Sequence, residues 1–194
     1  MSAHVRNIRA AIMVGSEGGK SFLASGYVRG QWNFNQRRSM VFDPWLKEKK
    51  RTDWGSGAWP CGEFDRWKRA VMTGPVDCGA VWDEGTTYGG RERDNVELFT
   101  AIRHRHPFFL FLGHRFDAML PVMRTSLTDV IIGGCRDGDA EEWADLFNDD
   151  DLLIAAKNEK EGGLAQYEFL HKRAFQPVRR LRYTSAQIMA GITF

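Results

Sequence analysis

The chain has 194 residues, of which 43% are hydrophobic and 27% charged, and its formal net charge is +2. This length suits one domain with a buried core, and the composition excludes a disordered chain. No apolar run reaches the roughly 20 residues of a membrane span, so we expect no transmembrane segment. Met1 to Arg9 lack the apolar stretch of a signal peptide, which predicts a cytoplasmic protein. The three cysteines form no Cys-x-x-Cys pair and predict neither a disulfide framework nor a zinc site.

The small net charge hides a segregation along the chain. The stretch from Asp137 to Glu161 holds ten acidic residues and two lysines, whereas Leu164 to Phe194 hold five basic residues and one acid. A polyanionic partner is therefore not excluded, because phosphate contacts need only a localised basic track. The same segregation also fits complementary faces of neighbouring subunits.

Short apolar runs alternate with helical patterns along the chain. The runs predict strands over 8–14, 39–42, 76–82, 108–112 and 129–132, and the helical patterns cover 20–30, 63–72 and 95–105. This alternation predicts an α/β fold with a mainly parallel central sheet flanked by helices.

Residues 52–67 are rich in glycine and tryptophan, and we interpret them as a long loop that leads into the helix over 63–72. Trp54, Trp59 and Trp67 are expected to cap the edge of the sheet or to pack at a subunit interface. An alternative is that they stack on the bases of a bound nucleic-acid strand.

A glycine-rich segment follows the first predicted strand and opens the first predicted helix. Successive amides of such a loop can point at one anion, and the helix N-terminus adds its N–H groups and dipole. Lys20 would reach the β- and γ-phosphates of a nucleotide, and the Ser21 hydroxyl would ligate Mg²⁺. Only three residues separate Gly15 from Gly19, so the loop is one residue shorter than the usual motif, and a purely structural turn is the alternative. The residues assigned to nucleotide binding are Gly15, Ser16, Glu17, Gly18, Gly19, Lys20, Ser21 and Phe22.

Two adjacent carboxylates, Asp83 and Glu84, end the third predicted strand. In a parallel sheet this strand end lies on the same edge as the glycine-rich loop. Asp83 would hold the Mg²⁺ shell, and Glu84 would act as the base that polarises an attacking water. With the lysine loop in the right order, the pair predicts nucleotide hydrolysis.

The fourth predicted strand ends in Gly113-His114-Arg115. His114 is a candidate γ-phosphate sensor, because its strand is expected between the two motif strands; an ordinary capping histidine is the alternative. Arg115 could stabilise developing charge within the site or across a subunit boundary. The rival candidates for an arginine acting on a neighbouring subunit are Arg91, Arg93 and Arg136.

Two other polar clusters favour structural roles. His104 and His106 have no third ligand at a metal-binding spacing and fit a helix end. The acidic run over 148–151 lacks the spacing of a calcium loop, and we interpret it as a solvated turn that caps a short helix.

The segments GSEGGKS, VFDP, AVWDEG and FFLFLGHRFDAMLPVMRTSLTDVII resemble the FtsK–HerA superfamily of P-loop DNA-pumping ATPases over about Ile8 to Arg136. Within it, a bare domain of this size resembles the genome-packaging ATPases of membrane-containing double-jelly-roll viruses. This resemblance implies a RecA-like P-loop fold, ATP and Mg²⁺ as cofactors, and a homo-oligomeric ring, hexamer or pentamer. It also implies pumping of double-stranded DNA into a preformed capsid.

The same resemblance implies capsid or membrane vertex proteins as partners and a location at the packaging vertex of the virion. It assigns phosphate and Mg²⁺ binding to Lys20 and Ser21, with His114 or Arg115 in the sensor and arginine position. We expect one ATPase domain over 1–194, with its motif core at about 8–136 and an acidic, then basic extension packed on it. A P-loop small-molecule kinase and a nucleotide-gated assembly protein with weak hydrolysis stay as alternatives.

Overall fold

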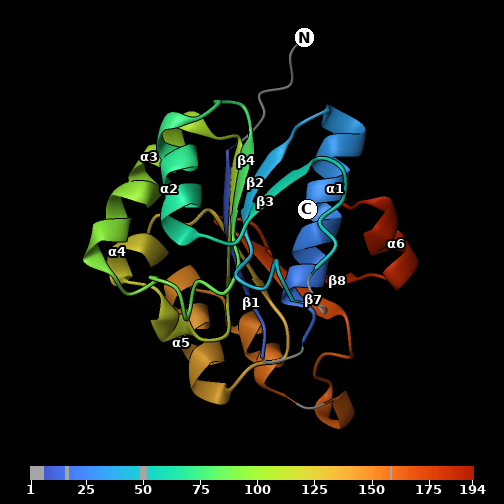
Figure 1. Ribbon diagram of the computed structural model, residues 1–194. Helices are drawn as coiled ribbons and strands as arrows, with labels where there is room; N and C mark the ends of the chain where they lie inside the picture. The colour runs from blue at the N-terminus through green and yellow to red at the C-terminus, as the bar shows by residue number, and fades with distance from the viewer. Residues whose placement is uncertain (1–6, 16–17, 49–51, 158) are drawn as a thin grey trace.

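The computed structural model describes residues 7–15, 18–48, 52–157 and 159–194. Its centre is an eight-stranded sheet with the order β3-β2-β4-β5-β1-β6-β7-β8 (Figure 1). The six strands from β3 to β6 are parallel, and β7 and β8 are antiparallel additions at one edge. The expected α/β fold with a mainly parallel sheet is confirmed. The strands are β1 (Ile8–Met13), β2 (Ser39–Phe42), β3 (Ala58–Cys61), β4 (Gly79–Trp82), β5 (Phe108–Gly113), β6 (Asp129–Ile132), β7 (Glu168–Arg173) and β8 (Arg179–Arg182).

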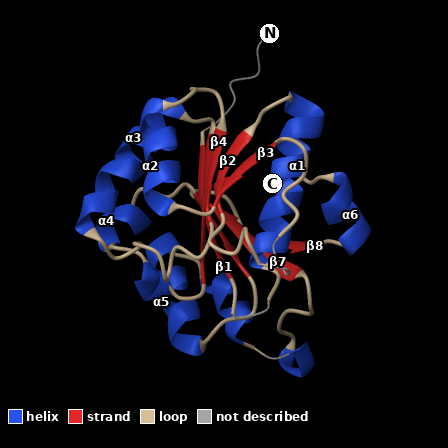
Figure 2. Ribbon diagram, viewed as in Figure 1, coloured by secondary structure: helices blue, strands red, loops and turns tan. Residues whose placement is uncertain are grey.

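Helices cover both faces of the sheet (Figure 2). On one face lie α1 (Lys20–Asn35) and α6 (Ser185–Ala190), and on the other lie α2 (Phe64–Thr73), α3 (Val96–Arg105), α4 (Pro121–Arg124) and α5 (Asp137–Phe147). Short 3₁₀ turns complete the connections: η1 (Arg93–Asn95), η2 (Phe116–Ala118), η3 (Asp150–Ala156) and η4 (Glu159–Glu161).

The central strands are mostly apolar because helices cover both of their faces, although Arg9 lies in β1 and Asp129 begins β6. Every residue of β5 is buried, and so is every residue of β4. The hydrophobic core consists of two clusters, one on each face of the sheet. The larger one contains the buried rings of Trp67, Trp82 and Trp143, and the other packs Tyr27 of α1 against Phe108.

The segment over 52–67 differs from the expected loop, because β3 forms within it and pairs with β2 in parallel register. Trp54 and Trp67 are buried, and their indole N–H groups donate to Asp43 Oδ2 and the Met40 carbonyl at 2.9 and 3.1 Å. Trp59 lies on the edge strand and is 41% exposed. The two buried rings therefore belong to the hydrophobic core on the faces of the sheet, and do not cap its edge as expected.

Several element bounds also differ from those expected. The strand before Asp83 begins at Gly79 rather than at residue 76, and the first helix continues to Asn35. In the C-terminal stretch, β7 and β8 join the sheet, although no strand is predicted there. Within the described residues, no helix is long and apolar enough to cross a membrane.

His106 and the acidic run over 148–151 have the structural roles expected of them. Both ring nitrogens of the buried His106 lie within 2.9 Å of backbone carbonyls, those of Cys78 and Val71. The Asp149 carboxylate accepts the Asp151 N–H at 3.2 Å and caps η3. In the part of the chain that the structure describes, no group of three or more His, Cys, Asp or Glu residues could hold a metal ion by itself.

Candidate functional site

The candidate residues meet at the carboxyl ends of β1, β4 and β5. Because β5 pairs with both β1 and β4, the loops that follow these three strands emerge side by side on one edge of the sheet. Ligands of open α/β sheets bind at this edge. The topology therefore brings together side chains that are separated by up to 94 positions in the sequence.

The glycine-rich loop turns tightly from β1 into α1. A Cβ atom at Gly18 would lie 2.1 Å from Val14 Cγ1, so the loop admits only glycine there without rearrangement. Gly19 has a φ of 85° and serves as the N-cap of α1, a conformation that glycine adopts without a steric penalty. Gly15 donates to the Gly134 carbonyl at 3.0 Å, which ties the loop to the segment after β6. Ser16 and Glu17 lie outside the described residues.

Lys20 is the first residue of α1, and its side chain is almost fully buried. Its ammonium group donates to Glu84 Oε1 at 2.7 Å and lies 2.9 Å from His114 Nε2. A buried ammonium is costly unless polar groups surround it, and these two side chains lie within hydrogen-bonding distance of it. The structure thus joins three predicted site residues in one contact group.

Ser21 and Asp83 form a second contact. The Ser21 hydroxyl lies 3.0 and 2.9 Å from the two carboxylate oxygens of Asp83. Burial raises the pKa of Asp83 to about 6, although the Lys20 charge and the Ser21 hydrogen bond act in the opposite direction. A hydroxyl and a carboxylate are hard oxygen donors of the kind that Mg²⁺ takes beside phosphate oxygens and waters, so the pair fits that ion. A cation bound there would favour the ionised carboxylate.

Glu84 is held in the ionised form. Burial opposes its ionisation, but hydrogen bonds from His114 and Lys20 and the Lys20 charge outweigh that effect and lower its pKa to about 2. Its backbone has a φ of 51°, a left-handed conformation that is uncommon for a residue with a side chain. Strained positions of this kind persist where the surrounding structure enforces them, and here the conformation accompanies a carboxylate directed at Lys20.

His114 is fixed from three sides. Its Nδ1 lies 3.1 Å from the Val14 carbonyl, which can only accept, so Nδ1 carries a hydrogen, and Nε2 lies 2.9 Å from Lys20 Nζ and 3.4 Å from Glu84 Oε2. Its backbone N–H donates to Thr86 Oγ1 at 3.0 Å. Thr86 is a site residue that sequence reasoning missed. The one feature of the sequence that could have indicated Thr86 is its position, two residues after the acidic pair.

The candidate arginines differ in their ion pairs and in whether they line the cavity beside His114. Arg91 and Arg115 both pair with Asp117, the latter at 3.2 Å, and both lie at the surface. Arg115 and Arg136 line the same cavity of about 370 Å³, together with Gly15, Thr86, His114, Gly134 and Cys135. Arg93 is exposed in η1, away from this cavity lining. Within one chain, two arginines thus flank the space beside His114.

The C-terminal segment also reaches the glycine-rich loop. Phe22 is half-buried, and its ring lies 6.0 Å from that of Tyr167 between ring centroids. A Cβ atom at Gly19 would lie 3.0 Å from the Tyr167 ring. Tyr167 therefore packs against the start of α1, and no spacing in the sequence indicated this contact.

The comparisons with known proteins bear on the fold. No family model matches the sequence, and no curated protein matches it. Among solved structures, the genome packaging NTPase B204 from Sulfolobus turreted icosahedral virus 2, in complex with sulfate, aligns with a TM-score of 0.67 at 15% identity. The alignment covers 93% of this chain and 100% of that one. The chain has the fold of this viral NTPase.

Two further structures support the assignment of the fold. The same packaging NTPase in complex with ATPγS aligns with a TM-score of 0.66 at 16% identity, over 92% of this chain and 97% of that one. The pCW3 conjugation coupling protein TcpA, a monomer form with ATPγS, aligns with a TM-score of 0.57 at 10% identity, over 95% of this chain and 64% of that one. The expected P-loop ATPase architecture is thereby confirmed at the level of the fold.

Proposed function

We propose that this chain is an ATPase that couples ATP hydrolysis to the translocation of double-stranded DNA into a preformed viral capsid. One observation carries the proposal: Lys20, Ser21, Asp83, Glu84 and His114 converge on one sheet edge in direct contacts of 2.7 to 3.4 Å. The fold shared with a viral genome packaging NTPase supports the same function.

In this proposal, the loop from Gly15 to Ser21 and the first turn of α1 hold the phosphates of ATP. Lys20 places its positive charge against the β- and γ-phosphates, and Ser21 and Asp83 hold Mg²⁺, which neutralises charge that develops on the phosphate oxygens. Phe22, the second residue after Lys20, would border the bound nucleotide.

Glu84 is the proposed base. Its carboxylate orients a water for in-line attack on the γ-phosphorus and accepts a proton from it, while the bond between the γ-phosphorus and the bridging oxygen of ADP breaks. His114 would contact the γ-phosphate through Nε2, the nitrogen that faces the site. Arg115 or Arg136, or an arginine of a neighbouring subunit such as Arg91 or Arg93, would stabilise the transferred charge.

Lys20 links the phosphate site to the proposed base. Its ammonium donates to Glu84 Oε1 at 2.7 Å. Phosphate groups that draw Lys20 away would release Glu84 for water and His114 Nε2 for the γ-phosphate. ATP binding and readiness for hydrolysis are thus coupled through one side chain.

The proposal extends to the assembly and its location. The chain works as one ATPase domain over 1–194 in a homo-oligomeric ring around duplex DNA. It acts in the host cytoplasm and at the packaging vertex of the virion, against capsid or membrane vertex proteins. The segregated charge supports a localised track for DNA, because uniform basicity would hold the duplex too tightly for stepwise release.

Substitution of Lys20 tests the site directly. Lys20→Ala removes the charge that binds phosphate, so Mg²⁺-dependent ATP hydrolysis should fall to background and nucleotide binding should weaken. Lys157→Ala, at an exposed position in the acidic stretch, is the matched control and should behave as wild type. Phosphate release and the binding of a fluorescent ATP analogue are the measurements. Hydrolysis that survives Lys20→Ala contradicts the site, and tight binding without turnover in the wild type supports the nucleotide-gated assembly protein instead.

A further inference from the structure

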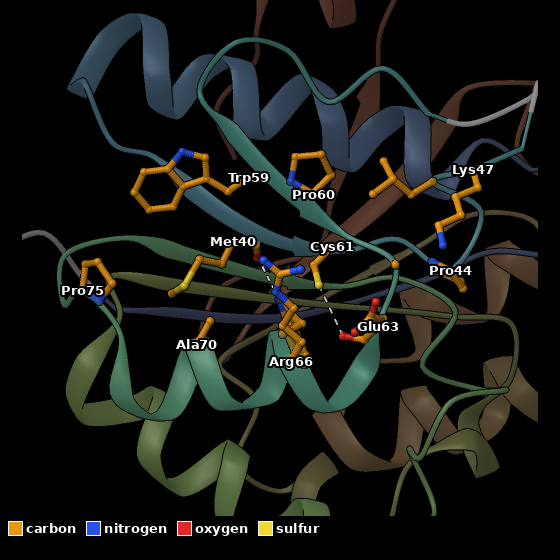
Figure 3. A pocket seen from close by; sticks show the side chains of 13 residues that line it. Met40, Pro44, Lys47, Trp59, Pro60, Cys61, Glu63, Arg66, Ala70 and Pro75 are labelled. Carbon is orange, nitrogen blue, oxygen red and sulfur yellow. Dashed lines mark hydrogen bonds between the residues drawn. The ribbon is translucent and has the colours of Figure 1, made fainter.

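A cavity lies between the edge strand β3 and α2, and its lining contains none of the residues assigned to the nucleotide site. Its volume is about 490 Å³, and Figure 3 shows Trp59, Pro60 and Cys61 on one wall and Arg66 and Ala70 on the other. The floor includes the buried Met40 and Trp67. We refer to this cavity, bounded at its ends by Pro44 with Lys47 and by Pro75, as the β3–α2 groove.

The groove combines an apolar floor with unpaired positive charge. Arg66 extends from α2 towards β3, and Lys47 lies at the opposite side of the opening (Figure 3). Within the described residues, no carboxylate forms an ion pair with either cation. Glu63 is the one acidic side chain in the lining. The groove therefore favours an occupant that offers both an apolar group and carboxylates.

Addition of a β-strand to this edge is disfavoured. Pro60 lies in the middle of β3 and lacks an N–H group, which interrupts the row of donors that an added strand requires. Recognition must therefore come from side chains in the groove rather than from a backbone ladder.

The opposite end of the molecule carries the complementary chemistry. Asp137, Glu141 and Asp145 recur every four residues on α5, so they form one stripe along the helix. All three are exposed, and in the described part of the chain none of them forms an ion pair. Like charges at this spacing repel each other unless a cation is close.

A fully exposed aromatic ring accompanies the acidic stripe. Phe175, in the turn between β7 and β8, is 104% exposed and has a φ of 62°. It lines a cavity with Leu146 and Phe147 at the end of α5, so the ring and the stripe belong to the same end of the molecule. An exposed aromatic beside charged groups is typical of an interface residue.

The two surfaces lie at opposite ends of one layer. In Figure 1, α2 and α5 both cover the same face of the sheet, α2 towards β3 and α5 towards the β6–β7 side. We propose that the β3–α2 groove of one copy receives the end of a second copy formed by α5 and the β7–β8 turn. Phe175 enters the groove, and the α5 carboxylates pair with Arg66 and Lys47. Contacts between two different surfaces repeat head to tail and close into a ring when the rotation allows.

This inference rests on the proposed function only in that a ring is part of it, and reciprocal charge reversal tests it. The groove variant is Lys47→Glu with Arg66→Glu, and the helix variant is Glu141→Lys with Asp145→Lys. Each should raise the dissociation constant for self-association by about tenfold or more, since charges of one sign then face each other. A 1:1 mixture of the two variants, and one chain that carries all four substitutions, should assemble again. Phe175→Ala should weaken assembly without changing charge.

Sedimentation velocity over a concentration series with Mg²⁺ and ATPγS is the measurement. The control Arg103→Glu with His104→Glu places two new carboxylates on exposed positions of α3 and should leave assembly unchanged. Reversed variants that assemble like the wild type, or a chain with all four substitutions that fails to recover, overturn the interface while the ring of the proposed function stands. A wild type that stays monomeric at every concentration overturns both. Nucleic acid is the alternative occupant of the groove. It is indicated if oligothymidylate quenches the tryptophan fluorescence of the wild type but not of Trp59→Phe, and if the charge reversals leave assembly unchanged.

Discussion

The hydrogen-bonding capacity of His114 is divided between two different partners. Nδ1 is committed to the Val14 carbonyl at the end of β1, which leaves Nε2 directed at Lys20. The residue that would sense phosphate is therefore oriented by the backbone of the strand that precedes the phosphate loop.

The role of Glu84 as a base gives a prediction at this scale. Glu84→Gln keeps the size of the side chain but removes its ability to accept a proton, so ATP turnover should fall by about 10²–10⁴-fold. Nucleotide binding should persist, because Lys20 and the loop amides remain. Steady-state phosphate release and equilibrium binding of a fluorescent ATP analogue separate the two effects. Turnover within threefold of the wild type (roughly 0.65 kcal/mol of barrier) would remove Glu84 from the chemistry.

The sequence predicts the contacting residues of the site better than their supports. Lys20, Ser21, Asp83, Glu84 and His114 could be found because each follows a strand in a recognisable order. Thr86 and Tyr167 could not, since their contacts with His114 and Gly19 depend on how distant segments pack. The arginines stay unranked for the same reason: their partners, such as Asp117, are visible only in the fold.

At the scale of elements, α1 and α6 pack unusually closely. A Cβ atom at Gly30 would lie 2.1 Å from the Ile192 carbonyl oxygen, and one at Gly26 would lie 2.7 Å from Ile188 Cγ2. These two glycines of α1 let the C-terminal segment close over the core. The same contact explains why Ile188 and Ile192 are buried near the end of the chain.

Gly30→Ala should therefore destabilise the protein. The new methyl group has no room, and overpacking of this kind costs about 1–3 kcal/mol of unfolding free energy. Gly138→Ala in α5 is the matched control, because nothing lies within 4 Å of a Cβ atom there and alanine favours a helix. Urea unfolding followed by circular dichroism measures both. Equal stability of Gly30→Ala and wild type would contradict the described packing of α6.

The antiparallel strand β7 is fastened to β6 by a buried polar cluster. Asp129 Oδ1 accepts from His171 Nε2 and Arg173 Nε, both at 2.8 Å. Arg179 can only donate to His171 Nδ1, at 2.9 Å, so the Nε2 hydrogen is directed to Asp129. Burial opposes ionisation of Asp129, but the His171 and Thr128 hydrogen bonds and the Arg173 charge outweigh it and lower the pKa of the carboxyl.

This lowered pKa predicts a pH-dependent contribution to stability. Because the folded pKa lies below the unfolded value of about 3.9, the contribution is complete above that value and disappears as pH falls through the folded pKa. Asp129→Asn should cost about 1.5–3 kcal/mol of unfolding free energy at pH 7, and the difference from wild type should shrink below about pH 4. Urea unfolding at a series of pH values measures this. A constant difference down to pH 2 would show that ionisation of Asp129 is not involved.

Strand prediction succeeded where burial is two-sided and failed at the sheet edges. The central strands β1, β2, β4, β5 and β6 are mostly apolar, so the apolar pattern of the sequence predicts them. The edge strand β3 contains Trp59 and Pro60 within a glycine-rich segment, and its pattern resembles a loop. Strand β8 reads Arg-Arg-Leu-Arg, because charged side chains protect an exposed edge and hide the strand signal.

At the scale of the whole molecule, the acidic and basic stretches of the sequence form different elements of the structure. The acidic stretch forms α5, η3 and η4, whereas the basic stretch supplies β7, β8 and the outer edge of the sheet. Part of that basic charge is neutralised locally, since Lys172 pairs with Asp149 at 2.5 Å and Arg180 with Glu168 at 3.0 Å. The acidic stripe of α5 has no such partner within the described residues, which is why we assign it to a contact between copies.

We propose that this chain hydrolyses ATP as a motor on duplex DNA, and phosphate release measured with and without DNA distinguishes such a motor from other ATPases. We predict Mg²⁺-dependent hydrolysis by the wild type that rises several-fold with duplex DNA of random sequence. It should be lost in Glu84→Gln with or without DNA. No phosphate release at any protein concentration, with Mg²⁺ and DNA present, would contradict the account, and so would transfer of phosphate to a metabolite without any effect of DNA.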